Sequence, residues 1–338
     1  MPKIARAGLA LMAATFLSGA ANANEVNIYT TREPGLIQPL LDAYKEKTAT
    51  TVNTVFLKDG LAERVASEGD KSPADILMTV DAGNLVDLVD KGLTQAVDSQ
   101  TLKDAVPEQL RDANGNWYGL SMRARVVYAD KDLELDQINY EDLADPKWKG
   151  KICIRAGQHP YNTALIADYI AHHGAEKTEE WLTGLKANLA RKAAGGDRDG
   201  AKDIAGGICD IAVANSYYVG LMRSGKGGDE QKTWADSIKV ILPTFKDGGT
   251  QVNISGAAVA KNAPNKEEAV KLLEYLVSDE AQQLYAKANY EYPVKQGASV
   301  DPIVESFGEL KIDQVPLSEI VTHRKQASEL VDKVGFDN

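Results

Sequence analysis

The chain has 338 residues, of which 38 are lysine or arginine and 49 are aspartate or glutamate, so its formal net charge is −11. This acidic balance argues against nucleic acid as a partner, because binding to phosphate backbones requires a basic face. The length is sufficient for two domains, each with its own hydrophobic core.

The N-terminus has the features of an export signal. Lys3 and Arg6 form a basic region, Ala7–Phe16 is a short apolar core, and Ala21–Ala23 offers small residues for cleavage. An ordinary N-terminal helix is the alternative, but no acidic residue occurs in this stretch. We therefore predict a signal peptide over residues 1–23 and a mature protein located outside the cytoplasm.

Strands and helices alternate in the first part of the mature chain. We expect strands at 25–29, 51–56 and 74–80, and helices at about 36–47, around Leu61 and Val65, and at 84–91. This rhythm indicates a parallel sheet with helices on its faces. Such sheets bind ligands at the carboxyl ends of their strands.

A second αβ block begins near Lys151. It holds expected strands at 152–155 and from Cys209, and expected helices at about 162–171 and 179–189. A further strand is expected at 252–260, followed by helical patterns that include 267–287. Because no flexible linker separates the blocks, we predict two α/β lobes joined by short strands that cross between them, at 123–128 and 253–258. The first lobe is then 24–124 plus about 255–300, and the second is 125–254 plus about 301–338.

The only two cysteines are Cys153 and Cys209, and each lies in a short apolar run. An even pair in an exported protein indicates a disulfide. If the two runs are neighbouring strands, a bridge is geometrically possible; otherwise both residues are free buried thiols. A lone pair without CxxC spacing is poor evidence for zinc.

Tyrosines follow two expected strands of the second lobe. Tyr217 and Tyr218 come after the strand that ends near Ala214, and Tyr161 follows the strand that contains Cys153. A strand end that leads into a helix is where an α/β lobe presents ligand-binding groups. The three hydroxyls are thus candidates for one cleft, although tyrosines more often pack as aromatics with the hydroxyl at the surface.

A convergent group of phenols suits ferric iron, a hard and highly charged cation that prefers anionic oxygen ligands. A free phenol has a pKa of about 10 and is a poor ligand at neutral pH. Coordination to a strong cation displaces the proton, so affinity then depends on pH. Three phenolates balance the three charges of the metal.

Several motifs occur in order along the chain: Ser72–Ile76, Trp117–Leu120, Arg123–Val126, Leu143–Gly150, Asn215–Tyr218, Gly249–Gly256 and Asn289–Pro293. Through them the chain resembles the periplasmic ferric-ion-binding proteins of bacterial ABC importers, including the cyanobacterial and Campylobacter types. The similarity runs from about Glu25 to about Val294. It implies a type II periplasmic binding protein fold, in which two α/β lobes close over a cleft.

The resemblance implies Tyr161, Tyr217 and Tyr218 as the core ligands of Fe³⁺. Family members commonly add residues from the loop after the first strand, often His-Tyr or Gln plus a Tyr. Here that loop, Thr31–Leu36, contains no tyrosine, and Glu33 stands at the position often held by His or Gln. The first lobe then contributes Glu33, water or a small anion.

Family members often hold a synergistic anion such as carbonate beside the iron, bound by an arginine. Arg123 is the first candidate for this role and Arg125 the second. Two residues apart on a strand, they point to the same face, so both could reach one cleft. A guanidinium fork suits a planar bidentate anion, but structural ion pairs at the hinge are the alternative.

The resemblance also implies that a monomer docks on an inner-membrane ABC permease with its cytoplasmic ATPase. We expect no enzyme activity, because no Ser-His-Asp, Cys-His or paired acid–base arrangement has a convincing context. Two alternatives stay open. One is a binding protein for an organic cation, a polyamine or a phosphate-bearing solute, and the other is a periplasmic metallo-hydrolase, which needs an open coordination position, a water and a base.

The histidines give little support for a metal site of their own. His159 is separated from Tyr161 by Pro160, so we expect it to be exposed or to lie behind the ligands. His172 and His173 have no ligand-like partner nearby in sequence, and we expect both at the surface.

Overall fold

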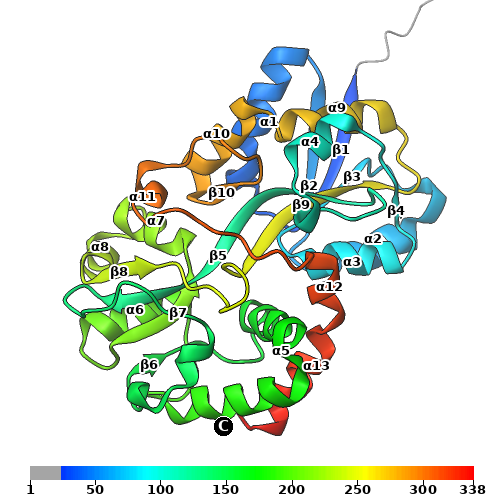
Figure 1. Cartoon of the computed structure of the whole chain (residues 1–338). Helices are drawn as coiled ribbons and strands as arrows, with labels where there is room; N and C mark the ends of the chain where they lie inside the picture. The colour runs from blue at the N-terminus through cyan, green and yellow to red at the C-terminus, as the bar shows by residue number, and fades with distance from the viewer. Residues whose placement is uncertain (1–23) are drawn as a thin grey trace, which may run out of the picture.

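Two α/β lobes are stacked in Figure 1, and two long strands pass from one to the other. The computed structural model describes residues 24–338, so the predicted signal peptide at 1–23 lies outside the described residues. Within residues 24–338, no helix combines the length and the apolar character that crossing a bilayer requires. The prediction of two α/β lobes joined by crossing strands is confirmed.

The first lobe is built on three parallel strands. β1 (Glu25–Thr30) lies between β2 (Thr51–Phe56) and β3 (Ile76–Thr79), in the alternating order that the sequence predicts. All four residues of β3 are buried, as expected for a strand covered on both faces. The segments that follow β1 and β3 leave the sheet at its carboxyl edge, where Thr31 and Val80 line a cavity between the lobes.

Helices cover both faces of this sheet. They are α1 (Pro34–Thr48), α2 (Leu61–Glu68), α3 (Ala82–Asp90), α4 (Gln100–Ala105), α9 (Lys266–Leu276) and α10 (Asp279–Asn289). α1 shows why these segments are helical: Ile37, Leu40, Leu41 and Tyr44 recur at intervals of three and four residues and are all buried. The predicted helical segment 267–287 is two helices, because Ser278 caps the start of α10.

The two crossing strands are β5 (Tyr118–Asp130) and β9 (Val252–Ala260), which pair antiparallel. The first half of β5 pairs with β9 as far as Ala124, and its second half pairs with strands of the second lobe. β9 continues into the first lobe beside β3. β5 therefore belongs to the sheets of both lobes. Two short strands add to the first-lobe sheet: β4 (Thr94–Gln95) pairs with β9, and β10 (Tyr292–Pro293) pairs with β5.

The second lobe places β5 between β7 (Ile211–Asn215) and β8 (Ile238–Ile241), with β6 (Ile152–Cys153) parallel to β7. Its helices are α5 (Pro160–Ala187), α6 (Asp197–Ala205), α7 (Tyr217–Arg223), α8 (Asp229–Asp236), α11 (Pro302–Glu305) and α13 (Arg324–Lys333). The two helices predicted at 162–171 and 179–189 form α5, which bends at Gly174, where φ is 78°. Only glycine takes that backbone conformation without strain.

The C-terminal segment makes a further crossing. It leaves the first lobe after β10, reaches α11 beside α7, and forms a bridge between Ile312 and Thr250 ahead of β9. α12 (Leu317–Thr322) then packs on both α3 and α5. Just beyond it, Arg324 of the second lobe lies 3.5 Å from the carboxylate of Asp81 in the first. The tail therefore contacts both lobes beside the crossing strands.

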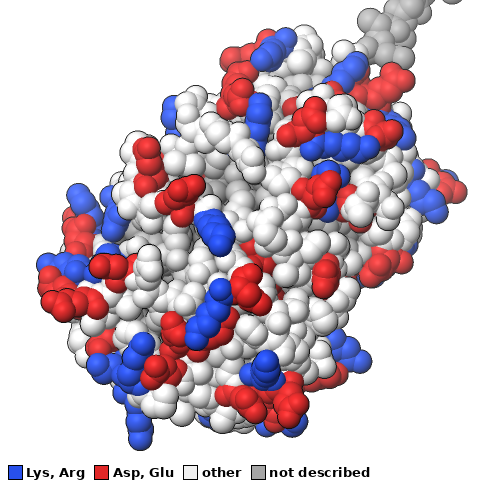
Figure 2. Space-filling view, in the orientation of Figure 1, with Lys and Arg blue, Asp and Glu red and all other residues white. Residues whose placement is uncertain are grey.

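Acidic and basic side chains are interspersed on the face shown in Figure 2. That face offers no continuous basic surface on which a phosphate backbone could lie.

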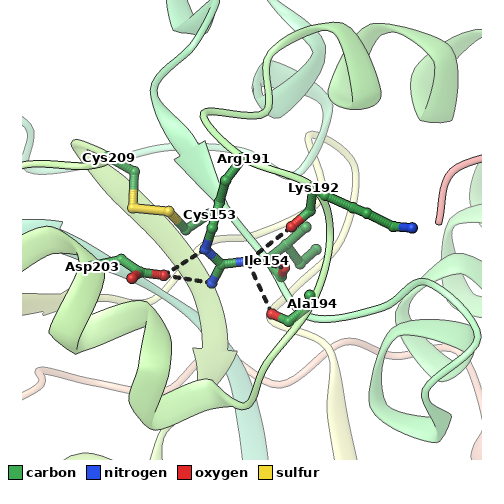
Figure 3. Close-up of a disulfide and its surroundings, with 7 residues drawn as sticks. All are labelled: Cys153, Ile154, Arg191, Lys192, Ala194, Asp203 and Cys209. Carbon is green, nitrogen blue, oxygen red and sulfur yellow. Dashed lines mark hydrogen bonds and ion pairs between the residues drawn. A yellow bond between two sulfur atoms is a disulfide. The ribbon is translucent and has the colours of Figure 1, made fainter. Parts of the chain in front are cut away.

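A disulfide joins Cys153 in β6 to Cys209, just ahead of β7, with Cα atoms 5.9 Å apart (Figure 3). The neighbouring Arg191 donates from Nε to Asp203 at 2.6 Å and from Nη1 to carbonyl oxygens of the 192–194 turn. The bridge and this arginine together hold β6, β7 and the end of α6 at one corner of the second lobe.

Reduction of the Cys153–Cys209 bridge is expected to lower the free energy of unfolding by about 2–4 kcal/mol, because the cross-link spans 56 residues and restricts the unfolded chain. Urea denaturation followed by circular dichroism, with and without a reductant, measures the difference. A Cys153→Ala/Cys209→Ala variant is the control and should not respond to the reductant. The expectation would be contradicted if thiol labelling showed both cysteines to be reduced and the reduced protein were as stable as the oxidised one.

Candidate functional site

Three tyrosines stand at the starts of two helices on the inner side of the second lobe. α5 begins at Pro160, and the His159 side chain caps it by accepting from the Tyr161 backbone N–H at 3.2 Å. α7 begins at Tyr217, two residues after the last residue of β7. Both helix starts follow strand ends, so the local sequence delivers Tyr161, Tyr217 and Tyr218 to the same edge of the lobe.

Two of the three hydroxyls meet directly. The hydroxyl oxygens of Tyr161 and Tyr217 are 3.3 Å apart, and both residues line a cavity of about 220 Å³ between the lobes. Tyr218 is behind Tyr217, with the two ring centroids 4.1 Å apart, and does not line the cavity. The structure thus brings Tyr161 and Tyr217 together at the cavity wall and places Tyr218 against them.

The faces of these rings are already covered. The Arg155 guanidinium is 5.0 Å from the centroid of Tyr161, and that of Arg198 is 5.2 Å from the centroid of Tyr218. Because the Tyr217 ring also packs at a tilt against Tyr218, what Tyr161 and Tyr217 offer a ligand in the cavity is mainly the hydroxyl. The arrangement suits coordination by oxygen more than stacking on a flat or cationic solute.

Burial makes these phenols reluctant to ionise alone. It raises the pKa of Tyr217 well above its ordinary value, and repulsion from Tyr161 and Tyr218 in their charged forms adds to the rise. Burial likewise raises the pKa of Tyr218. A cation that replaces the protons has to supply the stabilisation that the desolvated phenolates lack.

The first lobe supplies the opposite wall of the cavity, including Arg32, Glu33 and Leu36. Arg32 is already paired, with Nη1 2.9 Å from the carboxylate of the buried Glu291. Glu33 is exposed, immediately precedes α1, and makes no side-chain hydrogen bond or ion pair with any other described residue. Its carboxylate is therefore the free anionic oxygen donor on this wall.

Arg123 and Arg125 have different surroundings although they share one strand. Arg123 lines the cavity and donates to Ser255 Oγ at 3.2 Å and to the carbonyl oxygens of Val80 and Ile254, which are all neutral acceptors. Its positive charge therefore has no carboxylate partner within residues 24–338. This is the environment in which a guanidinium can hold an anion.

Arg125 is 1 % exposed and does not line the cavity. It donates to Asp197 at 2.7 Å and to the side-chain oxygens of Asn215 and Asn162 at 3.1 and 2.6 Å. Arg155 pairs with the same aspartate at 3.1 Å. Two arginines share one carboxylate, so an excess positive charge remains beside the tyrosines and offsets part of the cost of phenolates there.

Some residues of the site were not anticipated from the sequence. Arg32, Glu291, Arg155 and Asp197 form its supporting ion pairs, and only the motif containing Glu291 gave a sequence signal. His159 is half-buried and caps α5; burial and then the charge of Arg155 lower its pKa to about 4.

The expectation that His172 and His173 lie at the surface is wrong. Their side chains are 8 % and 18 % exposed, and both contact carboxylates. Their partners, Asp313 and Glu141, are distant in sequence, so spacing could not reveal them.

A larger hollow of about 320 Å³ lies between α2 and α3 in the first lobe and meets the cavity at Thr31 and Val80. Its lining includes Lys58, Asp59 and Lys91 but none of the tyrosines. We place the candidate site in the smaller cavity, because the hydroxyls of Tyr161 and Tyr217 meet at its wall and no tyrosine lines the larger hollow.

Comparison with known proteins agrees with this architecture. The profile of the family described as bacterial extracellular solute-binding protein matches residues 71–308. Iron uptake protein A2 of Synechocystis is 40% identical over 321 residues, which are 94% of this chain and 91% of that protein.

Two solved structures extend the comparison. A Bordetella ferric binding protein superposes with a TM-score of 0.91 at 68% identity, covering 93% of this chain and 100% of its own. A Trichodesmium protein solved with iron and citrate ligands has a TM-score of 0.88 at 41% identity, covering 92% and 99%. The expected type II periplasmic binding protein fold is confirmed by these neighbours.

Proposed function

The chain belongs to the bacterial extracellular solute-binding protein family, and on that premise we propose that it captures ferric iron between its lobes and delivers it to an ABC permease. The observation that carries the proposal is the meeting of the Tyr161 and Tyr217 hydroxyls, 3.3 Å apart at the cavity wall, with Tyr218 against them. Relatives and neighbours named for iron uptake and ferric binding support the same ligand.

Binding proceeds in two stages. Iron first replaces the phenolic protons of Tyr161, Tyr217 and Tyr218, and Tyr218 turns toward the cavity to complete the set. The first lobe then closes, and Glu33 adds a carboxylate oxygen, which compensates for the absence of a tyrosine from that loop. Three phenolates match the trivalent charge, as hard-ligand chemistry requires. The closed form is the one that docks on the permease, which a cytoplasmic ATPase drives.

Arg123 holds an anion beside the iron in this proposal. It is the cavity-lining arginine without a carboxylate partner, and a carbonate or a carboxylate fits its fork. The Trichodesmium neighbour was solved with citrate as well as iron, so an oxygen-rich anion can accompany the metal in a related protein. Arg125 keeps a structural role, because its donors are engaged by Asp197 and two asparagines.

Replacing any one of Tyr161, Tyr217 or Tyr218 with Phe is expected to lower ferric affinity at least about 100-fold, which is close to 3 kcal/mol, because each change removes an anionic ligand. Competition with a chelator of known iron affinity measures the loss. The phenolate-to-iron absorption band of the loaded protein should weaken in parallel.

Tyr275→Phe is the matched control for this series. Tyr275 lies in α9 of the first lobe, and its buried hydroxyl has no hydrogen-bond partner among the described residues, so the change should alter neither affinity nor colour. Glu33→Gln should weaken binding less than any of the three tyrosine changes. Unchanged affinity in all three tyrosine variants would remove the proposed site.

Acidification is expected to release the iron. Since burial raises the pKa values of Tyr217 and Tyr218, both phenols carry their protons at neutral pH, and each coordinated phenolate must release one proton. Affinity therefore falls as pH falls, by up to about 10-fold per pH unit for each phenolate, or a logarithmic slope approaching 3. Tyr217→Phe should reduce this slope by about 1. A slope that is the same in the variant would exclude Tyr217 as a ligand.

Arg123→Gln is expected to remove the dependence of iron affinity on bicarbonate or citrate, because the anion then has no cationic partner in the cavity. Iron titrations at increasing anion concentration measure the dependence in the parent and the variant. Arg64→Gln, a change on an exposed helix of the first lobe, is the control and should respond to the anion like the parent. A parent protein whose affinity ignores both anions would contradict this role.

A further inference from the structure

A second cluster of ligand-type side chains lies on α5, away from the interlobe cavity. It consists of Asp168 and His172 on α5 and Asp313 on the crossing tail, and one ligand atom from each lies within 4.8 Å of the others. His172 Nε2 is 3.1 Å from Asp313 Oδ2 and 3.8 Å from Asp168 Oδ1. At 1.5 Å of rise per residue, His172 is roughly 16 Å along α5 from Tyr161, so the cluster is separate from the tyrosines.

Asp168 makes this cluster unusual. The residue is 0 % exposed, and neither of its carboxylate oxygens has a hydrogen-bond partner among the described residues. Buried carboxylates in proteins are normally paired or bound to a metal, because an unpaired one carries a large desolvation penalty. The nearest donor in the cluster is His172 Nε2, 3.8 Å from Asp168 Oδ1 and beyond hydrogen-bond distance, so the buried carboxylate has a neighbour but no hydrogen bond.

The other two members are already oriented. His172 Nδ1 is 3.1 Å from Asp247, an exposed carboxylate that fixes the ring with Nε2 toward Asp168 and Asp313. A carboxylate on the far ring nitrogen is the usual support of a metal-binding histidine. Asp313 accepts from the backbone N–H groups of Gly249 and Val315 at 2.7 and 2.9 Å, which hold its carboxylate in place.

The loop beside the cluster packs closely against it. A Cβ atom on Gly248 would be 2.2 Å from Asp313 Oδ2 and 2.7 Å from His172 Cε1, so a larger residue would displace both. The His172 ring also stacks on Phe245, with centroids 4.1 Å apart. The positions of the His172 ring and the Asp313 carboxylate are thus set by the loop that contains Phe245 and Gly248, which lies outside α5.

We propose that Asp168, His172 and Asp313 form a binding site for a divalent transition-metal ion, zinc above all. His172 Nε2 and one oxygen from each aspartate supply three ligands, and a water molecule completes a tetrahedron. Two carboxylates and a neutral imidazole balance the charge of the ion. A mixed nitrogen and oxygen set of this size suits zinc, whereas calcium takes six to eight oxygens.

Such an ion would fasten the crossing tail to the second lobe. Asp313 follows Ile312, which bridges to Thr250 just ahead of β9, and α12 starts a few residues later at Leu317. Without the ion, the tail is held here by His172 and by backbone hydrogen bonds. The site is structural in this view and independent of iron capture.

Zinc binding to the mature chain tests the proposal directly. The protein is stripped with a chelator and dialysed against Zn²⁺ in a Tyr217→Phe background, which weakens metal binding in the cavity. We expect one equivalent of zinc with a dissociation constant of about 1 μM or below, which corresponds to about 8 kcal/mol. A protein that binds no zinc in this background overturns the proposal.

Variants locate the ion. Asp168→Asn and His172→Gln, made in the same background, should each weaken zinc binding at least 10-fold. His173→Gln removes the neighbouring histidine of the same helix and should bind zinc like its parent. If Asp168→Asn and His172→Gln both bind zinc as tightly as the Tyr217→Phe parent, the assignment is overturned.

A measurement without any cluster substitution covers the case in which those variants fold poorly. Anomalous diffraction at the zinc edge, from crystals of the zinc-loaded Tyr217→Phe protein, should show a peak within bonding distance of His172 Nε2 and Asp168. A peak elsewhere or no peak overturns the proposal. Because no step uses iron, either outcome leaves the ferric proposal to its own tests.

Discussion

The continuity of β5 through both lobes is the constraint on which the rest of the structure depends. Each half of this strand is hydrogen-bonded into a different lobe, so the lobes can rotate about it but cannot separate. The change of partner strand falls between two arginines of β5. Arg123 lies opposite Asn253 of β9, and Arg125 lies opposite Asn215 of β7. Two arginines only two residues apart thereby serve different lobes.

Much of this architecture follows from local sequence patterns. Apolar periodicity and strand–helix alternation predict the parallel part of each lobe, because those patterns report which faces are buried. The break of α5 at Gly174 also falls between the two helices that the sequence predicts. The antiparallel return of β9 is different, since it depends on the strands beside it. Likewise, the burial of His172 depends on Asp313, 141 residues away, which no local pattern encodes.

The candidate site divides in the same way. That Tyr161, Tyr217 and Tyr218 reach one edge follows from chain order, since strand ends of a parallel sheet share an edge. Chain order does not predict which of Tyr217 and Tyr218 faces the cavity. Successive residues of a helix point about 100° apart, so the answer depends on the residue at which α7 begins. The same holds for Glu33: local sequence does not show that the neighbouring Arg32 pairs with Glu291, 259 residues away, and not with Glu33.

Charge balance explains why a phenol-lined cavity suits this ligand. Before loading, Arg32 and Glu291 cancel, Arg123 and Glu33 are of opposite sign, and the buried phenols of Tyr217 and Tyr218 are held neutral by raised pKa values. In the proposed site, exchanging three phenolic protons for one trivalent ion leaves that total unchanged. The cavity therefore avoids the cost of burying net charge, which grows steeply in a low-dielectric site. In that proposal, iron and protons compete for the same phenolic oxygens, so pH controls whether the iron stays bound.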